Sequence, residues 1–245
     1  MSGKIEVIGI NIDNVTLDEA AERMVEFLQE DRYNMVFTPN SEILVEAVKK
    51  PDFEKVLNSG NLVIPDGIGV VIASGFYGTP LKERVTGFDL TKRLIEIAAA
   101  QSKAIYILGG KEGVAEEAAI NLIGTYSGLK IAGTRNGYFG IDEEDEIVEQ
   151  INSSGADILI AAMGAPKQEQ FIYRNRDKLK VRIAIGVGGS IDILAGRAKR
   201  APEFYQKAGL EWFYRLMKEP SRAGRMLTRL PKFIILAFYD SRTRY

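Results

Sequence analysis

Polar residues and glycines gather at four points where an apolar segment gives way to a helical one. The four segments are 38–42 (TPNSE), 65–67 (PDG), 164–169 (GAPKQE) and 186–192 (GVGGSID). In open α/β sheets, ligands bind beyond the carboxyl ends of the strands, where the free N–H groups of the following helix favour an anion. Each segment taken alone is equally consistent with a tight turn. Together, at one edge of one sheet, they predict a nucleotide site.

Asp66 is the carboxylate that its position singles out as a candidate for chemistry. The chain has no His and no Cys, so acid–base chemistry falls mainly to carboxylates, Lys or Tyr. Asp66 follows a short apolar segment and lies between Pro65, which stiffens the loop, and Gly67, which lets a ligand approach. The alternative is that Asp66 caps a helix that begins near residue 68, a common position for Asp.

Four further polar side chains are candidates for ligand contacts. Arg84 lies in a loop before a helix, where a guanidinium can bind a phosphate through two parallel hydrogen bonds; an ordinary surface Arg is the alternative. Asn40 and Gln168 could fix sugar hydroxyls or an acetamido group, with helix capping or solvent exposure as the alternative. Asp192 is either a ligand contact or a residue of a first helical turn.

The familiar motifs for nucleotide phosphates and metals are absent. Neither the glycines of 186–190 nor Gly109 and Gly110 complete a G-x-G-x-x-G motif, and there is no Walker A loop. No Asp-x-Asp pair follows a strand. The acidic run 142–146 is interpreted as a solvated first helical turn. We therefore expect no metal and no cofactor, and an anionic leaving group must be stabilised by arginines and backbone N–H groups.

The C-terminal region differs in charge from the rest of the chain. Residues 197–245 contain 12 Lys and Arg against 4 Asp and Glu, a net charge of +8, whereas residues 1–196 carry −9. Four arginines recur at spacings of 7, 3 and 4, which keeps them near one helical face: Arg215, Arg222, Arg225 and Arg229.

A basic helix with aromatic residues is typical of a segment that lies on an anionic membrane surface. The alternatives are packing on the chain's own globule or a contact between copies in a homo-oligomer. The acidic remainder argues against a nucleic-acid site.

Alternating strand-like and helix-like segments must position these residues. The expected strands are continuous apolar runs at 5–10, 33–38, 62–64, 104–108, 129–132, 157–164 and 182–189. Continuous runs with intervening helices predict an α/β fold with a mostly parallel sheet and helices on both faces. A capping box of Thr16 and Glu19 should begin the first helix.

After residue 196 no strand pattern returns. Helices are expected at 202–218, about 221–229 and 232–239, interrupted by Pro220 and Pro231. We therefore divide the chain into a core, 1–196, and a helical appendage, 197–245. The N-terminus resembles no secretory signal, and no apolar run approaches the roughly 20 residues that span a bilayer, so a cytoplasmic location is expected.

Six ordered motifs resemble a known family, the WecG/TagA/CpsF glycosyltransferases (glycosyltransferase family 26), and in particular its TagA branch. The motifs are TPNSEI (38–43), PDGIGVV (65–71), ERVTGFDL (83–90), ILGG (107–110), MGAPKQEQFI (163–172) and GVGGSIDILAGRAKRAPEF (186–204). The ending GLEWFYRLMKEPSRAGRM (209–226) looks like the C-terminal segment of the family.

This resemblance implies a Rossmann-like core and an appendage that helps form the active site at the inner face of the cell membrane. It also implies the reaction that the chain catalyses. TagA-like enzymes transfer N-acetylmannosamine from UDP-N-acetylmannosamine to the 4-hydroxyl of N-acetylglucosamine on undecaprenyl diphosphate, in synthesis of the wall teichoic acid linkage unit. The transfer inverts the anomeric carbon and is expected to need no metal.

The resemblance also implies roles for residues of the matching motifs. Asp66 would deprotonate the acceptor hydroxyl, and Arg84 would steady the reacting groups or the acceptor diphosphate. Thr38 and Gln168 would also belong to the catalytic residues and, together with Asn40, would line the sugar site. The remaining residues would bind substrates: Asp192 and the loop of Gly188 and Gly189 would hold the uridine side, Gly109 would contact substrate, and Arg215, Arg222 and Arg225 would close over the diphosphates.

Other functions remain open at this point. The donor could be UDP-N-acetylmannosaminuronic acid or another UDP-sugar. The chain could also be a nucleotide-sugar-binding module without catalysis, for which turnover is the discriminating test. A dinucleotide oxidoreductase is disfavoured because the dinucleotide fingerprint is missing.

Overall fold

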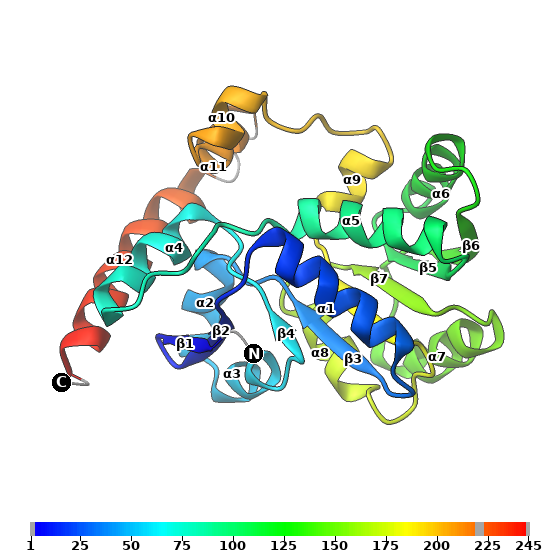
Figure 1. Cartoon of the computed structure of the whole chain (residues 1–245), viewed down its shortest axis with the longest axis horizontal. Helices are drawn as coiled ribbons and strands as arrows, with labels where there is room; N and C mark the ends of the chain where they lie inside the picture. The colour runs from blue at the N-terminus through cyan, green and yellow to red at the C-terminus, as the bar shows by residue number, and fades with distance from the viewer. Residues whose placement is uncertain (1–2, 219–222, 244–245) are drawn as a thin grey trace.

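A six-stranded parallel sheet forms the centre of the molecule in the computed structural model, which describes residues 3–218 and 223–243 (Figure 1). Its strand order is β4-β3-β8-β7-β5-β6. The strands are β3 (Asn34–Phe37), β4 (Leu62–Val63), β5 (Ala104–Gly109), β6 (Lys130–Arg135), β7 (Ile158–Ala162) and β8 (Ile183–Gly186). Every neighbouring pair is parallel, so the carboxyl ends of all six strands lie at one edge.

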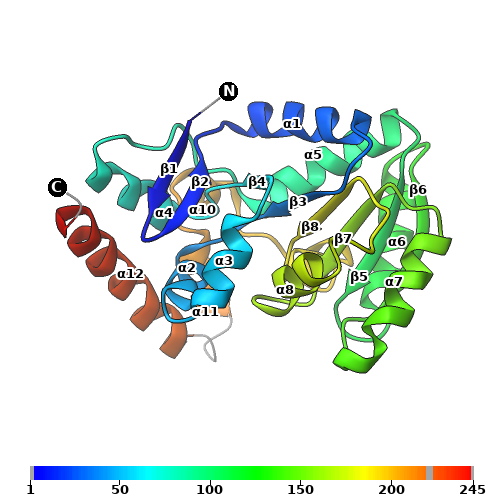
Figure 2. The same ribbon diagram turned by 90° about the horizontal axis from the view of Figure 1, so that it is seen from below.

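Helices cover both faces of this sheet, which confirms the predicted fold class. One face is covered by α1 (Leu17–Gln29), α5 (Gly87–Ala100), α6 (Val114–Thr125) and α9 (Ser190–Leu194). The other is covered by α2 (Ser41–Val48), α3 (Pro51–Asn58), α7 (Glu144–Ser153) and α8 (Lys167–Arg174). Figure 2 shows α1 and α5 on one side of the sheet and α2, α3 and α8 on the other.

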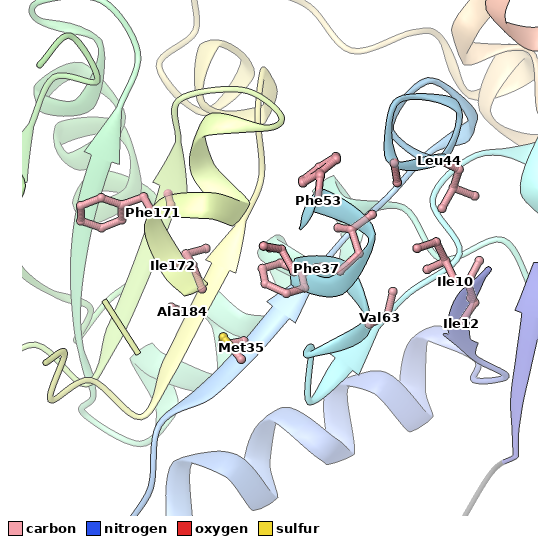
Figure 3. Packing of buried hydrophobic residues seen from close by; sticks show 14 of the residues in the cluster. Ile10, Ile12, Met35, Phe37, Leu44, Phe53, Val63, Phe171, Ile172 and Ala184 are labelled. Carbon is pink, nitrogen blue, oxygen red and sulfur yellow. The ribbon is translucent and has the colours of Figure 1, made fainter. Parts of the chain in front are cut away.

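The strand side chains alternate between two apolar clusters. Ile183 and Ile185 of β8 point into the cluster under α1 and α5, whereas Ala184 between them belongs to the cluster under α3 and α8. Figure 3 shows part of the second cluster, with Phe37 of β3 packed near Phe53 of α3. Because both faces are buried, the strands are apolar without a period of two, which is the pattern that the sequence contains.

The N-terminal segment 5–10, expected as one strand, is instead part of a hairpin. Strands β1 (Lys4–Val7) and β2 (Ile10–Asp13) pair antiparallel in a separate two-stranded sheet. Ile8 and Gly9 form the turn with φ of 44° and 84°, the positive values that a two-residue hairpin turn needs. Asp13 Oδ2 accepts a hydrogen bond from the Val63 N–H at 2.8 Å, which attaches the hairpin to β4.

Local sequence signals mark the beginnings of two helices. Thr16 and Glu19 form the expected capping box at the start of α1. Pro51 occupies the first turn of α3, where its missing N–H removes no helical bond. Helix α4 (Ile68–Ser74) continues into the 3-10 turn η1 (Gly75–Tyr77), and the 3-10 turn η2 (Ile141–Glu143) leads into α7.

The C-terminal region is helical as predicted, but its helices have different limits. The expected helix 202–218 is divided into α10 (Glu203–Lys207) and α11 (Glu211–Lys218), with Gly209 at φ 70° between them. Helix α12 (Ala223–Thr243) runs through Pro231, which was expected to end a helix. A Pro inside a helix costs one backbone hydrogen bond, and the helix nevertheless continues to the buried Phe233 and Ala237. Pro220 lies outside the described residues.

Helix α12 packs against α2, α4 and η1 (Figure 1). Phe233 and Ala237 are fully buried within the cluster that also contains α2 and α3. Phe238 meets Phe76 edge to face, with ring centroids 5.7 Å apart, and Tyr77 Oη donates to Asp240 Oδ2 at 2.7 Å.

The division of the chain near residue 196 into a core and an appendage remains a prediction. Over the described ranges, 3–218 and 223–243, no helix combines the length and apolar character needed to cross a bilayer.

Replacing Phe233 by Ala should lower the free energy of unfolding by about 3–5 kcal/mol, because it removes a fully buried aromatic side chain and leaves a cavity. Urea denaturation followed by circular dichroism measures the change. Ile235→Ala on the exposed side of the same helix is the matched control and should change stability by less than about 1 kcal/mol. Equal effects of the two substitutions would show that α12 does not pack on the core in solution.

Candidate active site

A crevice is expected at the carboxyl end of β8, where the chain leaves neighbouring strands in opposite directions. Strands β3 and β7, on either side of β8, lead into α2 and α8 on one face. Strand β8 leads into α9 on the other face. In open α/β sheets such switch points bind ligands. Three of the four polar segments found in the sequence follow these adjacent strands, and the fourth follows β4 at the edge next to β3.

Thr38 joins the ends of β3 and β8. Its buried hydroxyl donates a hydrogen bond to the Gly186 carbonyl at 2.9 Å. The start of α5 lies directly against the same side chain, since a Cβ added at Gly87 would come within 2.9 Å of Thr38 Oγ1. Thr38 therefore holds two strand ends together and places the loop containing Arg84 beside them.

Gln168 joins the loops that follow β7 and β8. Its Oε1 accepts hydrogen bonds from the N–H groups of Gly164 at 3.2 Å and Gly188 at 3.0 Å. Its Nε2 donates to Glu169 Oε1 at 2.8 Å. These bonds fix the orientation of a buried amide. Its contact with a sugar remains a prediction.

Asn40 caps α2, the alternative that its sequence context left open. Its Oδ1 accepts from the N–H groups of Glu42 at 3.0 Å and Ile43 at 3.2 Å. A Cβ at Gly67 would lie 3.8 Å from the Asn40 Cβ. The loops after β3 and β4 are thus in contact, and Asn40 lies beside the Asp66 loop.

Asp66 is partly exposed in the loop between β4 and α4. The N-cap position of α4 belongs to Gly67, at φ 97°, and not to Asp66. The Asp66 N–H donates to the Ile64 carbonyl at 3.0 Å, which makes the tight turn out of β4. Its role as a base remains a prediction.

The glycines and Asp192 surround the same edge of the sheet. Gly109 ends β5 so close to β7 that a Cβ would meet the Ala162 carbonyl carbon at 2.5 Å, which is a structural reason for glycine there. Gly188 and Gly189 lead from β8 into α9, and Asp192 lies in the first turn of α9. A Cβ at Gly189 would lie 3.9 Å from Asp192 Oδ2. Nucleotide binding by these residues remains a prediction.

Arg84 is not the surface residue that its sequence context allowed. Its side chain is largely covered, and Nη1 donates to Glu211 Oε2 at 2.7 Å. Nη2 donates to the Gln206 carbonyl at 2.9 Å. Both partners belong to the C-terminal segment, so Arg84 joins that segment to the core.

The predicted arginine face of the C-terminal region is only partly described. Arg215 lies in α11 and Arg225 in α12, with their side chains outside the described part of the chain, and Arg222 lies outside it altogether. Arg229 faces α2, where Nη2 lies 3.6 Å from Glu46 Oε2.

Glu169 is a buried carboxyl that the sequence analysis missed. Burial raises the pKa of Glu169 to about 7, although the hydrogen bond from Gln168 opposes the shift. Its Oε2 has no hydrogen-bond partner among the residues that the structure describes. A signal was present in the sequence: Glu169 lies three residues before Ile172, on the apolar face of α8.

The acidic run 142–146 was predicted to be solvated, and one of its residues is not. Glu144 is buried and forms an ion pair with Arg174 on α8. Its Oε2 also accepts from Asn175 Nδ2 at 3.3 Å. The rest of the run is exposed or half-buried as predicted. Within residues 3–218 and 223–243, no three acidic side chains are grouped as ligands for a metal ion.

The match to known proteins extends over almost the whole chain. Residues 5–245 match the Glycosyl transferase WecG/TagA/CpsF family. The chain belongs to this family, and its α/β core carries the glycosyltransferase motifs at one edge of the sheet.

Three curated relatives match most of the chain. Each of the following is called N-acetylglucosaminyldiphosphoundecaprenol N-acetyl-beta-D-mannosaminyltransferase. The protein of Bacillus spizizenii (strain W23) is 36% identical over 85% of this chain and 80% of its own length. That of Bacillus subtilis (strain 168) is 35% identical over 86% and 81%. That of Staphylococcus aureus (strain MRSA252) is 32% identical over 95% and 91%.

The buried Glu169 should make folding stability depend on pH. Its pKa is about 7 in the folded protein and 4.5 in an unfolded chain, so the folded state retains a proton that the unfolded state loses between these values. The free energy of unfolding should therefore fall as pH rises through this window, by on the order of 3 kcal/mol.

Urea denaturation at pH 4.5 to 8 measures this loss. In Glu169→Gln the loss should disappear, whereas Glu149→Gln, at an exposed position on α7, should retain it. An unchanged pH dependence in Glu169→Gln would contradict the assignment.

Proposed function

We propose that this chain is an inverting glycosyltransferase that moves N-acetylmannosamine from UDP-N-acetylmannosamine to N-acetylglucosamine on undecaprenyl diphosphate, in synthesis of the wall teichoic acid linkage unit. The observation that carries the proposal is the 32–36% identity, over most of the chain, to relatives named for that transfer. Four of the matching segments, 38–42, 65–67, 164–169 and 186–192, also follow adjacent strands of the sheet.

Asp66 acts as the base in this proposal. Inversion in a single displacement needs one group to accept the proton of the acceptor hydroxyl and a second set of groups to stabilise the departing diphosphate. Asp66 is partly exposed, next to the loop of Asn40 and at the same edge as Thr38. The N–H groups of the 186–190 loop and the arginines near the C-terminal segment supply positive partial and full charges for the diphosphate.

The direct test is release of UDP from UDP-N-acetylmannosamine in the presence of a water-soluble lipid-diphosphate-N-acetylglucosamine acceptor. The full chain is used, with and without EDTA. Release that depends on the acceptor and survives EDTA supports a metal-independent transferase. UDP binding without release from this or any other UDP-sugar would instead support a binding module without catalysis.

Asp66→Asn should lower kcat by roughly 10²–10⁴-fold, the usual contribution of a general base, and leave the Kd for UDP unchanged. Steady-state kinetics and calorimetry measure the two quantities. Asp52→Asn, at an exposed position on α3, is the control and should retain wild-type kcat. A wild-type kcat in Asp66→Asn would remove Asp66 from the mechanism.

In this proposal the chain attaches to the inner face of the cell membrane through the exposed side of helix α12. The outer side of α12 presents Ile235, Phe238 and Tyr239, each more than one-third exposed. Lys232 and Arg242 lie along the same side, and the Arg242 guanidinium lies 5.3 Å from the centre of the Phe238 ring. Aromatic and basic residues along one exposed side of a helix suit the boundary of an anionic bilayer.

Replacing Phe238 and Tyr239 together by Ser should weaken binding to vesicles that contain anionic phospholipid by roughly tenfold or more, because two apolar side chains no longer enter the bilayer boundary. Cosedimentation measures the binding. Ile120→Ser with Ile123→Ser removes exposed apolar groups from α6 and is the matched control. Equal loss in both double variants would contradict attachment through α12.

A further inference from the structure

Two arginines from different parts of the chain share one carboxylate. Arg84 Nη1 lies 2.7 Å from Glu211 Oε2, and Arg200 Nε lies 3.1 Å from Glu211 Oε1. Each carboxylate oxygen therefore has its own guanidinium partner. The three side chains are all largely covered, with 13–20% of each exposed.

Both guanidinium groups are also fixed by bonds that do not involve Glu211. Arg200 forms a bidentate pair with Asp89, at 2.6 and 2.8 Å, and lies over the Phe88 ring at 4.8 Å. Arg84 Nη2 is bonded to the Gln206 carbonyl. If the Glu211 carboxylate moved away, Arg200 would keep its partner on α5 and Arg84 its partner on α10. The remaining group, two arginines and Asp89, would then carry a net charge of +1.

This pair of arginines adjoins the candidate active site. The loop of Arg84 leads into Gly87, which lies against Thr38. The segment before Glu211 packs against the loop of Asp66: a Cβ added at Gly209 would lie 3.0 Å from the side chain of Ile68, which is two residues after Asp66. Glu211 follows Gly209 by two residues. A group bound between the two arginines would therefore be close to both the Thr38 and the Asp66 loops.

We propose that Arg200 joins Arg84, to which the resemblance already assigned a diphosphate, in one binding site for the diphosphate of a substrate, and that the Glu211 carboxylate occupies this site in the structure described here. Guanidinium groups bind phosphate and carboxylate oxygens with the same paired geometry. This inference rests on the proposed function for its substrates, because both the UDP-sugar donor and the lipid-linked acceptor carry a diphosphate. Arg200 becomes a binding residue, and Glu211 an internal competitor for the anion.

Calorimetry on the full chain tests the site with two probes, UDP and a short-chain alkyl-diphosphate-N-acetylglucosamine. Glu211→Gln removes the competing charge and keeps the side-chain shape. It should tighten binding of one of the two probes by roughly tenfold, the worth of one charged hydrogen bond. The probe that responds identifies whether the donor or the acceptor diphosphate binds here.

Glu211→Gln also removes bonds that hold α11, so the deciding comparison is with a double variant. The gain in affinity should vanish in Glu211→Gln combined with Arg200→Gln, and Arg200→Gln alone should weaken binding of the same probe. Glu203→Gln, an exposed position on α10 that loses the same charge, should change neither affinity. Weaker or unchanged binding of both probes in Glu211→Gln, or a gain that persists without Arg200, would overturn the proposal.

These outcomes are separable from failure of the proposed function. Binding of UDP or of the alkyl diphosphate does not require the donor sugar to be N-acetylmannosamine. If turnover with that donor is absent while Glu211→Gln still tightens binding through Arg200, the arginine site stands and the reaction assignment fails. If turnover with that donor is present but Glu211→Gln changes neither affinity, the reaction assignment stands and the arginine site fails.

Discussion

Hydrogen bonds from two buried side chains determine the shape of the candidate active site. Thr38 joins β3 to β8, and Gln168 joins the loops after β7 and β8. A buried amide or hydroxyl left without partners is costly, so each bond specifies the position of the backbone it contacts as well as stabilising it. Three loops that are far apart in the chain are thereby held in one arrangement. The start of α5 packs on Thr38 and the Asp66 loop packs on Asn40, so the positions of Arg84 and Asp66 depend on the same arrangement.

The C-terminal segment is joined to this arrangement by two different kinds of contact. Helix α12 buries Phe233 and Ala237 in the apolar cluster of the core, a contact that dissolved ions do not screen. The region of α10 and α11 is joined instead through ion pairs of Arg84, Arg200 and Glu211. Apolar burial supplies most of the stability of such packing, whereas the attraction within a largely covered ion pair is offset by the cost of removing both charges from water. The far end of the segment is therefore firmly packed, while the part nearest to the site is attached by groups that can exchange partners.

The sequence predicted those features that depend on neighbouring residues. Continuous apolar runs gave the parallel sheet, and the Thr16 and Glu19 spacing gave a cap that the structure confirms. Features that depend on distant partners were missed or wrong. The turn at Ile8 was unexpected because a branched residue rarely adopts positive φ. Helix α12 continues past Pro231 with Phe233 buried in the core, and Glu144 is buried in an ion pair with Arg174. Local spacing reveals neither contact. Likewise, Arg84 could be placed in a loop from the sequence, but its partner is 127 residues away.

The strand ends and the C-terminal segment respond differently to an incoming anion. The strand ends are held by neutral hydrogen bonds, which an incoming anion does not displace. The contact between Arg84 and Glu211, in comparison, has the same chemistry as a contact between Arg84 and a phosphate. An anionic substrate can therefore replace Glu211 without disturbing Thr38 or Gln168, and the Phe233 contact would keep the segment attached while it does so. Rigid strand ends and an exchangeable ionic contact thus allow the site to open locally while its base and its loops remain in place.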